Sequence, residues 1–317
     1  MTNILITGGA GFIGSNLIES LLKDKQNKIT CLDNFDSFYD SKIKRNNIES
    51  HLKNPNCTLV EGDIRDLSRV KAKLSKQYDV IIHLAAKVGV IPSLLDPTGY
   101  TEVNVLGTQN MLEFAKEVQC KKFIFASSSS IYGVNPSVPW KEDDRNLLPI
   151  SPYAATKISG ELLGHVYSNL FGMQFISLRF FTVYGPRQRP DLAIHKFAKL
   201  ISKKKAIDIY GNGKTKRDYT YVDDIIYGIK AALNYSGSQY EIFNLGNNNP
   251  VELRELIGLL EKKIGNKAII NNMSEQSGDV PITFADINKA QRLLGYKPTT
   301  SISAGLQKFY EWFKSQK

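Results

Sequence analysis

Residues 7–14 read Thr7-Gly8-Gly9-Ala10-Gly11-Phe12-Ile13-Gly14. The run directly follows the apolar segment 3–6 and precedes a helical pattern, which is the strand-turn-helix setting of a dinucleotide-binding fingerprint. In that setting Gly8 permits the tight turn, Gly11 lets backbone N–H groups approach a pyrophosphate, and Gly14 allows close helix packing. A glycine-rich connecting turn is the alternative interpretation, and the setting disfavours it.

Short apolar or β-branched runs alternate with helical patterns through the first half of the chain. The expected strands are 4–7, 28–32, 58–61, 80–84, 123–127 and 174–181, and the clearest helices are 11–23 and 97–118. This alternation predicts an α/β fold with a Rossmann-type doubly wound parallel sheet. Beyond residue 185 the turns become rich in Pro, Gly and Asn, which predicts a smaller α+β lobe. We therefore expect a dinucleotide-binding domain over 1–180 and a substrate lobe over 181–317, with a helix near 222–235 packing back on the first domain.

The end of the second predicted strand carries Asp33, about twenty residues after the fingerprint. A carboxylate at this point accepts hydrogen bonds from the adenosine ribose and repels a 2′-phosphate, which favours NAD over NADP. The nearby Lys42, Lys44 and Arg45 leave NADP as an alternative. Asp63 follows the third strand, where an adenine would lie, and capping of the next helix is an equally good interpretation.

Charge and composition narrow the class of partner. The chain carries a formal net charge of +10, but its lysines are spread out, and the run 203–205 is typical of a solvated helix end. We expect an anionic small substrate rather than nucleic acid. No apolar stretch reaches bilayer length and the first residues lack a basic n-region, so we expect no membrane association and a cytoplasmic location. Cys31, Cys57 and Cys120 sit singly in apolar segments, which predicts buried thiols and no metal site.

Two polar groups stand one helical turn apart in Tyr153-Ala154-Ala155-Thr156-Lys157. A free phenol has a pKa of about 10, so it is a poor base at neutral pH until a fixed positive charge, here Lys157, stabilises the phenolate. The serine run 127–130 ends the fifth predicted strand and so reaches the edge where Rossmann ligands bind. Tyr and Lys at this spacing occur by chance in many helices, so the pair gains its meaning from the serines and the fingerprint.

Taken in order, the three fingerprint glycines, Ser128, Tyr153 and Lys157 resemble the extended short-chain dehydrogenase/reductase family. Within it, the segments 179–186, 216–225, 278–286 and 294–300 look like UDP-sugar 4-epimerases, most of all UDP-glucuronate 4-epimerases. The resemblance implies NAD-dependent 4-epimerisation of a UDP-sugar through a 4-keto intermediate, with UDP bound by the second half of the chain. UDP-glucose and UDP-N-acetylglucosamine are alternative substrates. A net dehydrogenase or reductase and a non-catalytic NAD-binding protein fit the same motifs less well.

The resemblance also implies the residues of the site. In the catalytic set, Tyr153 takes the proton of the sugar 4-hydroxyl, Lys157 keeps the phenol acidic and Ser128 bonds the same oxygen. The residues implied to contact NAD are Gly8, Gly11, Phe12, Ile13, Gly14, Asp33, Asn34, Asp63, Ile64, Leu84, Ala85, Ala86, Asn104, Tyr153, Lys157 and Phe180. Those implied to contact the UDP-sugar are Ser128, Ser129, Thr182, Arg189, Arg217 and Asp279.

Two arginines are the cations expected in the substrate site. Arg217 is expected on the diphosphate, because a guanidinium fork matches phosphate oxygens, and a salt bridge to Asp218 or Asp223 is the alternative. Arg189 and Thr182 match positions that could hold the carboxylate of a uronate, with loop stabilisation as the alternative.

Four positions bear on which chemistry and which sugar are expected. Ser130 stands where dehydratases and decarboxylases of this family usually carry an acidic residue, so the acid or base for their second step is missing. Ile91 replaces an arginine common in glucuronate epimerases, and Gln276 replaces an arginine often found near the diphosphate. Thr283 replaces the tyrosine that narrows the pocket of glucose-restricted epimerases, so an N-acetyl group is expected to fit.

A homodimer is the oligomer that the resemblance implies. Helices over 97–118 and 153–171 are expected to pair with their symmetry mates as a four-helix bundle, and a twofold interface is the commonest oligomer geometry. The apolar residues expected in that seam are Leu106, Met111, Leu162 and Leu163, with packing on the protein's own sheet as the alternative.

Overall fold

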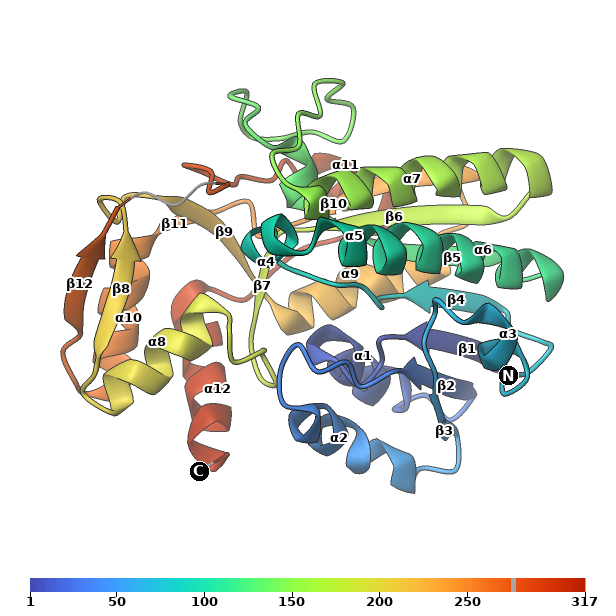
Figure 1. The fold of residues 1–317 in the computed structure, drawn as a ribbon, viewed down its shortest axis with the longest axis horizontal. Coiled ribbons are helices and arrows are strands. Elements are labelled where there is room, and N and C mark those ends of the chain that lie inside the picture. Colours follow the sequence, from blue (N-terminus) through green and yellow to red (C-terminus); the bar gives the residue numbers. More distant parts are fainter. Residues whose placement is uncertain (275–277, 317) are drawn as a thin grey trace.

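A seven-stranded parallel sheet forms the centre of the molecule (Figure 1). The computed structural model describes residues 1–274 and 278–316. The sheet has the order β10-β6-β5-β4-β1-β2-β3, and all its neighbouring strands are parallel. Its strands are β1 (Thr2–Thr7), β2 (Asn27–Asp33), β3 (Cys57–Glu61), β4 (Val80–His83), β5 (Lys122–Ser128), β6 (Gln174–Phe180) and β10 (Tyr240–Leu245). The predicted Rossmann-type sheet is confirmed, with the reversal of strand order lying between β1 and β4.

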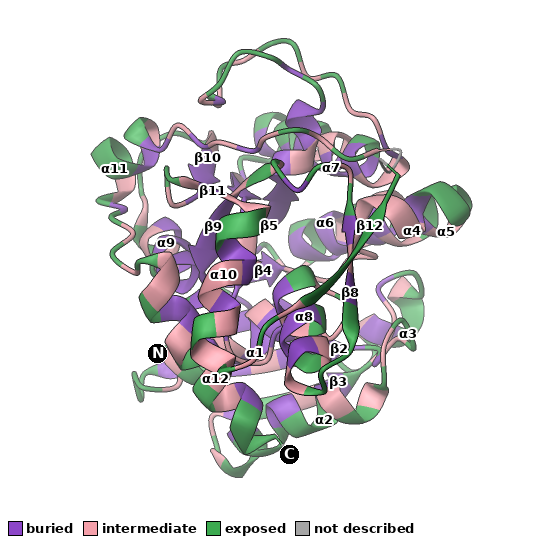
Figure 2. Ribbon diagram, turned by 90° about the vertical axis from the view of Figure 1, so that its left-hand side faces the viewer, coloured by how far each residue is buried: buried purple, intermediate pink, exposed green. Residues whose placement is uncertain are grey.

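Both faces of this sheet are covered by helices, which explains why its central strands β1, β4 and β5 carry the consecutive apolar residues 4–6, 80–82 and 123–126. Ile4 and Ile6 belong to the core shared with α1 (Phe12–Leu21) and α9 (Val222–Asn234). Leu5, between them, belongs to the core on the opposite face, shared with α3 (Leu67–Lys71), α6 (Gly107–Glu117) and α7 (Pro152–Phe171). In Figure 2 the strands β4 and β5 carry the colour of buried residues.

The helical run expected over 97–118 is present but is not uniform. It consists of α5 (Pro97–Thr101), a π-helical segment (Glu102–Leu106) and α6. A π-helical turn holds one residue more than an α-helical turn, and such turns are frequent at functional sites. The widened turn carries the buried side chain of Asn104.

The second half of the chain builds a smaller lobe beside the sheet (Figure 1). A three-stranded sheet holds β7 (Thr182–Tyr184), β9 (Lys216–Tyr221) and β11 (Pro250–Glu252), and a two-stranded parallel sheet holds β8 (Ala206–Tyr210) and β12 (Ile269–Met273). The helices of the lobe are α8 (Ala193–Ser202), α10 (Leu253–Ile264) and α12 (Ile302–Ser315), whereas α11 (Asn288–Leu294) packs on β10 and α9.

Three elements from the second half, β10, α9 and α11, pack with the large sheet. β10 extends it as an edge strand beside β6, and α9 packs on α1. One cluster of buried side chains runs from Ile4 of β1 to Phe309 of α12, so the lobes share a continuous core. The boundary at residue 180 therefore does not separate two hydrophobic cores. The division into a dinucleotide-binding domain and a substrate lobe stays a prediction about what each part binds.

The cysteines and the surface of the fold complete this description. Cys31, Cys57 and Cys120 are buried and free, as predicted. Within residues 1–274 and 278–316, no helix combines the length and the apolar character needed to cross a membrane. The same residues contain no cluster of three or more His, Cys, Asp or Glu side chains suited to a metal ion.

Candidate active site

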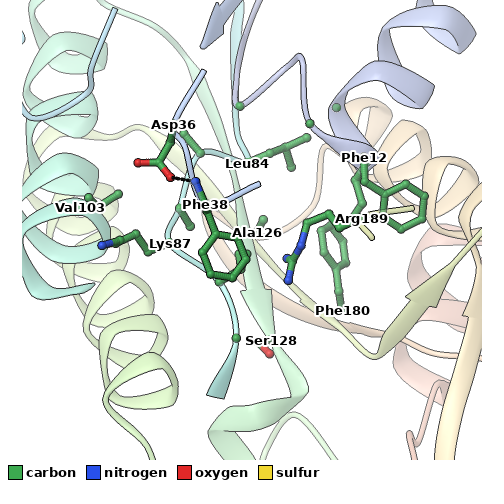
Figure 3. A pocket seen from close by; sticks show the side chains of 18 of the residues that line it. Phe12, Asp36, Phe38, Leu84, Lys87, Val103, Ala126, Ser128, Phe180 and Arg189 are labelled. Carbon is green, nitrogen blue, oxygen red and sulfur yellow. Dashed lines mark hydrogen bonds between the residues drawn. The ribbon is translucent and has the colours of Figure 1, made fainter. Parts of the chain in front are cut away.

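A cavity of about 380 Å³ lies where the carboxyl ends of β1, β4 and β5 meet the first strand of the small lobe (Figure 3). This is the position at which open α/β sheets bind ligands, and the volume is in the range of small-molecule sites. The residues expected from the sequence that line it are Gly8, Gly11, Phe12, Ile13, Gly14, Asp33, Asn34, Ile64, Leu84, Ala85, Ala86, Ser128, Ser129, Tyr153, Lys157, Phe180, Thr182 and Arg189. Asp63, Asn104, Arg217 and Asp279 are not among its lining residues.

The glycine turn has the geometry that a dinucleotide requires. Gly8 has φ +68°, and a Cβ there would lie 2.8 Å from the backbone nitrogen of Ala85. A Cβ on Gly14 would lie 2.4 Å from the carbonyl oxygen of Gly8. The helix α1 starts at Phe12, and its N-cap residue Gly11 provides no side-chain cap. Uncapped N–H groups at a helix N-terminus suit a pyrophosphate, so these residues fit the expected cofactor.

Asp33 is a buried carboxylate held by the backbone around it. It accepts hydrogen bonds from the N–H groups of Ala10 (3.0 Å) and Phe35 (2.8 Å). Burial raises the pKa of Asp33, while the bond from Phe35 and the charge of Lys44 oppose that rise. The carboxylate thus lies in the cavity wall with a fixed orientation, as ribose recognition requires.

Two of the three cations near Asp33, Lys44 and Arg45, are engaged elsewhere. Lys44 lines the cavity, but its Nζ donates to the carbonyl oxygen of Asp36 at 2.9 Å. Arg45 is exposed, and it pairs with Glu61 and lies over the ring of Phe35. Neither arrangement prepares a site for a ribose 2′-phosphate, which agrees with the expected preference for NAD.

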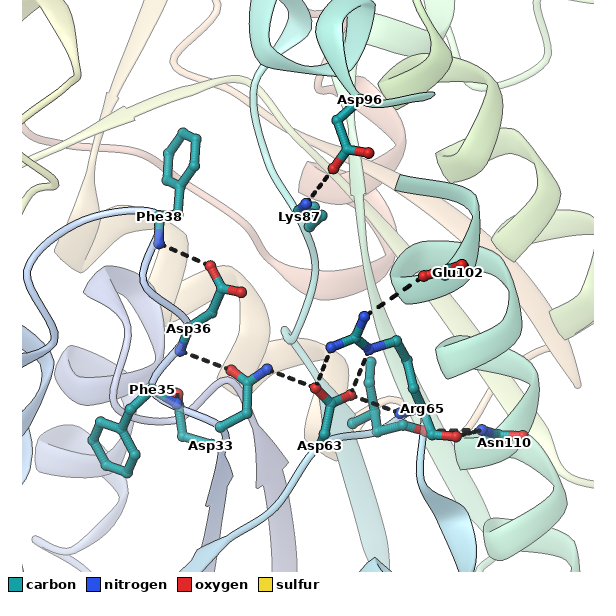
Figure 4. Close-up of polar contacts among 12 residues, drawn as sticks. Asp33, Phe35, Asp36, Phe38, Asp63, Arg65, Lys87, Asp96, Glu102 and Asn110 are labelled. Atoms are coloured by element: carbon teal, nitrogen blue, oxygen red, sulfur yellow. Dashed lines mark hydrogen bonds and ion pairs between the residues drawn. The ribbon is translucent and has the colours of Figure 1, made fainter. Parts of the chain in front are cut away.

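Asp63 acts on the cavity indirectly (Figure 4). Its carboxylate pairs with Arg65 at 2.7 Å and accepts a hydrogen bond from the amide of Asn34 at 3.0 Å. The bond from Arg65 lowers the pKa of Asp63 to about 2. Helix capping by this residue is wrong, because α3 is capped by Asp66. Asp63 therefore orients Asn34, which does line the cavity.

The candidate catalytic groups come from α7 and β5. Ser151 caps α7 by accepting the N–H of Ala154, so the helix starts immediately before Tyr153. One turn later, Lys157 is buried, and its Nζ donates to the carbonyl oxygen of Ala126 at 2.7 Å. Because Ala126 precedes Ser128 by two residues on β5, this bond brings all three candidate side chains to one wall of the cavity.

Burial dominates the electrostatics of this wall. It lowers the pKa of Lys157 to about 7, opposed by the charge of Glu161. Burial also raises the pKa of Tyr153, opposed by a hydrogen bond with Ser128 and by the charge of Arg189. In the protein without ligands, the phenol of Tyr153 is therefore neutral. The groups that favour its ionisation are Ser128 and Arg189, and the expected Lys157 is not among them.

Asn104 lies behind the cavity wall and connects two parts of it. Nδ2 of its side chain donates to the carbonyl oxygen of Lys87 (2.9 Å) and to Oγ1 of Thr156 (3.0 Å). Oδ1 of its side chain accepts the N–H of Lys87 (2.8 Å). The π-helical turn thereby joins the segment after β4 to α7. Asn104 supports the site in this structure and does not reach the cavity.

Arg217 and Asp279 meet each other outside the cavity lining. The guanidinium of Arg217 forms an ion pair with Asp279, so a salt bridge to Asp218 or Asp223 is wrong. Asp218 is fully buried and accepts three backbone N–H bonds, and Asp223 faces Lys308 at 3.9 Å.

Two of the positions that depart from the family pattern, Thr283 and Ile91, also lie outside the cavity lining. Thr283 is buried, and its hydroxyl accepts the N–H of Asp218 at 3.0 Å. Ile91 lies near Gly278, where a Cβ would be 3.9 Å from its Cδ1. Gln276 lies outside the described residues.

One part of the cavity was not predicted from the sequence. The loop between β2 and α2 (Ser41–Glu49) contributes Asp36, Phe38 and Tyr39. The available signal was an aromatic pair just beyond Asp33, at the ligand-binding edge of the sheet. Other lining residues that were not expected are Leu32, Lys44, Gly62, Lys87, Val88, Gly89, Val103, Ala126, Ser127, Ser130, Phe181, Val183 and Leu192.

A doubly wound parallel sheet with a glycine turn and a Ser-Tyr-Lys set on one cavity defines an extended short-chain dehydrogenase/reductase. The chain belongs to the family described as GDP-mannose 4,6 dehydratase, which it matches over residues 5–309. A UDP-glucuronate 4-epimerase of Thermodesulfobacterium geofontis is 41% identical, over 98% of this chain and 95% of that protein. The family description thus names a dehydratase, whereas this similar member is named an epimerase.

Solved structures are similar over the whole chain. The UDP-glucuronic acid 4-epimerase of Bacillus cereus, in complex with UDP-glucuronic acid and NAD, has a TM-score of 0.93 and 40% identity and covers 100% of both chains. A UDP-N-acetylglucosamine 4-epimerase of Methanobrevibacter ruminantium, in complex with UDP-N-acetylmuramic acid, has a TM-score of 0.89 and 30% identity, with 100% of this chain and 99% of that chain covered.

The buried ammonium of Lys157 predicts a specific pH dependence of stability. Its pKa is about 7 in the folded protein and about 10.4 in an unfolded chain, so between these values the unfolded state binds more protons. The cost of burying the charge is fully present below pH 7 and is relieved as the pH rises. Relative to Lys157→Met, we expect the free energy of unfolding of the native protein to rise by on the order of 1–3 kcal/mol between pH 7 and 10.

Urea unfolding of the protein without cofactor measures this difference at each pH. Lys76→Met is the control, because Lys76 is exposed and this replacement should leave the native pH dependence intact. Parallel curves for the native protein and Lys157→Met would contradict the depressed pKa of Lys157.

Proposed function

We propose that this chain is an NAD-dependent UDP-sugar 4-epimerase, and that UDP-glucuronate and UDP-galacturonate are the sugars it interconverts. The observation that carries the proposal is one cavity lined by the glycine turn, by Ser128, Tyr153 and Lys157, and by Arg189. Relatives named for this reaction align with nearly the whole chain. The lobe formed by residues 181–317 holds the UDP-sugar, with Arg217 as a cation for its diphosphate.

The proposed reaction needs only reversible oxidation at C4 of the sugar. NAD, when bound, supplies the acceptor that takes and then returns the hydride. Tyr153 removes the proton of the 4-hydroxyl and Ser128 hydrogen-bonds the same oxygen. Ser128 and Arg189 favour the phenolate, and we propose that Lys157, whose Nζ lies 5.9 Å from the ring centre of Tyr153, adds its positive charge to theirs. The 4-keto sugar turns over in the pocket so that the hydride returns to its opposite face, and Tyr153 gives the proton back.

Ser130 supports epimerisation rather than dehydration. It lines the cavity, and its N–H donates to Oγ of Ser128 at 3.1 Å. The hydroxyl of Ser130 stands where a carboxylate would be needed as the base that removes a second proton from the sugar. The 4-keto sugar is therefore reduced back instead of losing water.

Tyr153→Phe tests this chemistry, because it removes the proton acceptor and almost no volume. We expect UDP-glucuronate to give UDP-galacturonate with the native protein, without accumulation of NADH, and turnover to fall at least about 10²-fold in the variant. Mass spectrometry and NMR of the sugar products measure turnover, and retained NAD binding is the control for folding. Near-native turnover of Tyr153→Phe would contradict the mechanism, and net NADH production would indicate a dehydrogenase.

The choice of a uronate rests on Arg189 and Thr182, which both line the cavity. The side chain of Arg189 is only 15% exposed, and its guanidinium extends into the cavity (Figure 3). A carboxylate that enters a partly desolvated pocket needs a paired cation or several donors, and a charge-assisted hydrogen bond contributes roughly 1.5–3 kcal/mol. Arg189 can supply this interaction to the C5 carboxylate of the sugar.

Arg189→Ala should therefore weaken the reaction of the uronate much more than that of a neutral hexose. We expect kcat/KM for UDP-glucuronate to fall at least about tenfold, with a much smaller effect on UDP-glucose, whose hydroxymethyl group has no charge to lose. Direct competition between the two sugars in one assay gives the ratio. If the native enzyme prefers UDP-glucose or UDP-N-acetylglucosamine, the substrate is wrong while the catalytic mechanism stands.

We also propose a homodimer formed through α7 and the helical run before it. Leu162, Val166 and Leu170 are exposed at four-residue spacing along α7, and Leu162 and Leu170 are 63% and 64% exposed. Leu106 on the neighbouring run is also exposed. An apolar stripe of this kind suits a twofold helix pairing.

Two residues expected in the seam do not belong to it. Met111 is fully buried in the core between α6 and the sheet, so its assignment to the dimer interface is wrong. Leu163 is partly buried and packs on the same core. In both cases the alternative interpretation, packing on the protein's own sheet, holds.

Replacing Leu162 and Leu170 together with Asp should convert the dimer to a monomer, because two charges would be placed in each half of a desolvated seam. Light scattering at working concentration measures the mass. Leu293→Asp, on α11 and also exposed, is the control and should leave the mass unchanged. A native protein that is already monomeric would exclude the proposed dimer.

A cytoplasmic location is part of the same proposal. Its support is the presence of three free thiols, a state that reducing compartments maintain. Burial raises the pKa of Cys57 and of Cys120 to about 11, which keeps these thiols protonated and unreactive.

A further inference from the structure

Asp191 holds the guanidinium of Arg189 by one edge. Nε of Arg189 donates to Oδ1 of Asp191 at 3.0 Å, and Nη2 donates to Oδ2 at 2.6 Å. Both residues belong to the segment between β7 and α8. Arg189 lines the cavity and Asp191 does not. The carboxylate therefore approaches the guanidinium from outside the site.

The ring of Phe38, which comes from a different part of the chain, packs against the same guanidinium. The ring centre of Phe38 lies 5.4 Å from Cζ of Arg189, and both side chains are seen in the cavity in Figure 3. Phe38 comes from the loop after β2, whereas Arg189 comes from the small lobe. Contacts with an edge and with a ring face together restrict both the position and the plane of the guanidinium.

The pattern of donors leaves the second edge of the guanidinium free. A guanidinium has five N–H groups, and Asp191 takes the one on Nε and one on Nη2. In the described parts of the chain, no other acceptor is bonded to Arg189. Nη1 and the remaining N–H of Nη2 form the other edge, whose geometry matches the two oxygens of a carboxylate.

We infer that Asp191 is a positioning residue for the sugar carboxylate, because it fixes Arg189 by one edge and leaves the other for bidentate recognition. The inference rests on the proposed function. Asp191 is 40% exposed, so water screens its negative charge, and the cavity side of the guanidinium stays attractive to an anion. Holding the guanidinium in advance reduces the entropy that a flexible arginine loses on binding substrate.

Asp191→Asn tests the inference in the NAD-loaded enzyme, because an amide cannot accept both hydrogen bonds from the guanidinium. We expect KM for UDP-glucuronate to rise about tenfold, with kcat within about twofold and KM for UDP-glucose within about twofold of native. Asp191→Glu keeps two acceptor oxygens and should recover most of the affinity. In an Arg189→Ala background, Asp191→Asn should have no further effect on the uronate.

A matched control is available on the same segment. Arg187 pairs with Glu19 at 2.5 Å, two residues before Arg189, and Arg187 does not line the cavity. Glu19→Gln removes the partner of that arginine and should leave KM for both sugars unchanged.

Three results would overturn the inference. A lower KM of Asp191→Asn for UDP-glucuronate would mean that Asp191 competes with the substrate instead of positioning its partner. An equal loss with UDP-glucose would mean that Asp191 only stabilises the loop. A native enzyme without activity on UDP-glucuronate would overturn the proposed substrate and the inference together, and the native assay separates that case from the other two.

Discussion

The bond from the ammonium of Lys157 to the carbonyl oxygen of Ala126 fixes the site. It ties the first turns of α7 to the end of β5, and so sets the distance between the phenol of Tyr153 and the hydroxyl of Ser128. A buried ammonium is costly unless it is paired or hydrogen-bonded, and here the cost appears as the depressed pKa of the lysine. The buried ammonium of Lys157 therefore lowers the stability of the folded protein. It does so at the site where a charge that can change when ligands bind is needed.

Two parts of the chain build the cavity, and they contribute different kinds of groups to it. The sheet edge supplies fixed groups, such as the turn at Gly8 and the buried carboxylate of Asp33. The small lobe and the loop after β2 supply longer side chains that meet across the opening, with Phe38 against Arg189. This division suits a reaction in which the dinucleotide cofactor stays in place on the sheet edge while the sugar turns over beside it.

The sequence was sufficient for six of the seven strands of the large sheet because their signals are local, whereas β10, from the second half of the chain, was not predicted. The glycine turn, the apolar strands and the Tyr-Lys spacing each lie within a few residues, and each of these segments was found. Contacts between distant segments were not predictable in the same way. Asp63 was expected at an adenine or as a helix cap, and its pair with Arg65 was not foreseen, while Met111 was expected in a dimer seam but fills the core. Which of several neighbours a side chain contacts depends on its placement in the folded protein, and the periodicity of the sequence does not encode that placement.

The return of the chain to the large sheet has a consequence for how the protein can be divided. β10 covers the edge of β6, and α9 covers the apolar face of α1. A fragment that ended at residue 180 would expose an unpaired strand edge and a hydrophobic helix face, the two features that promote self-association of partly folded chains. The cofactor half therefore cannot serve as an independent module that acquires new partner lobes by simple fusion at its end.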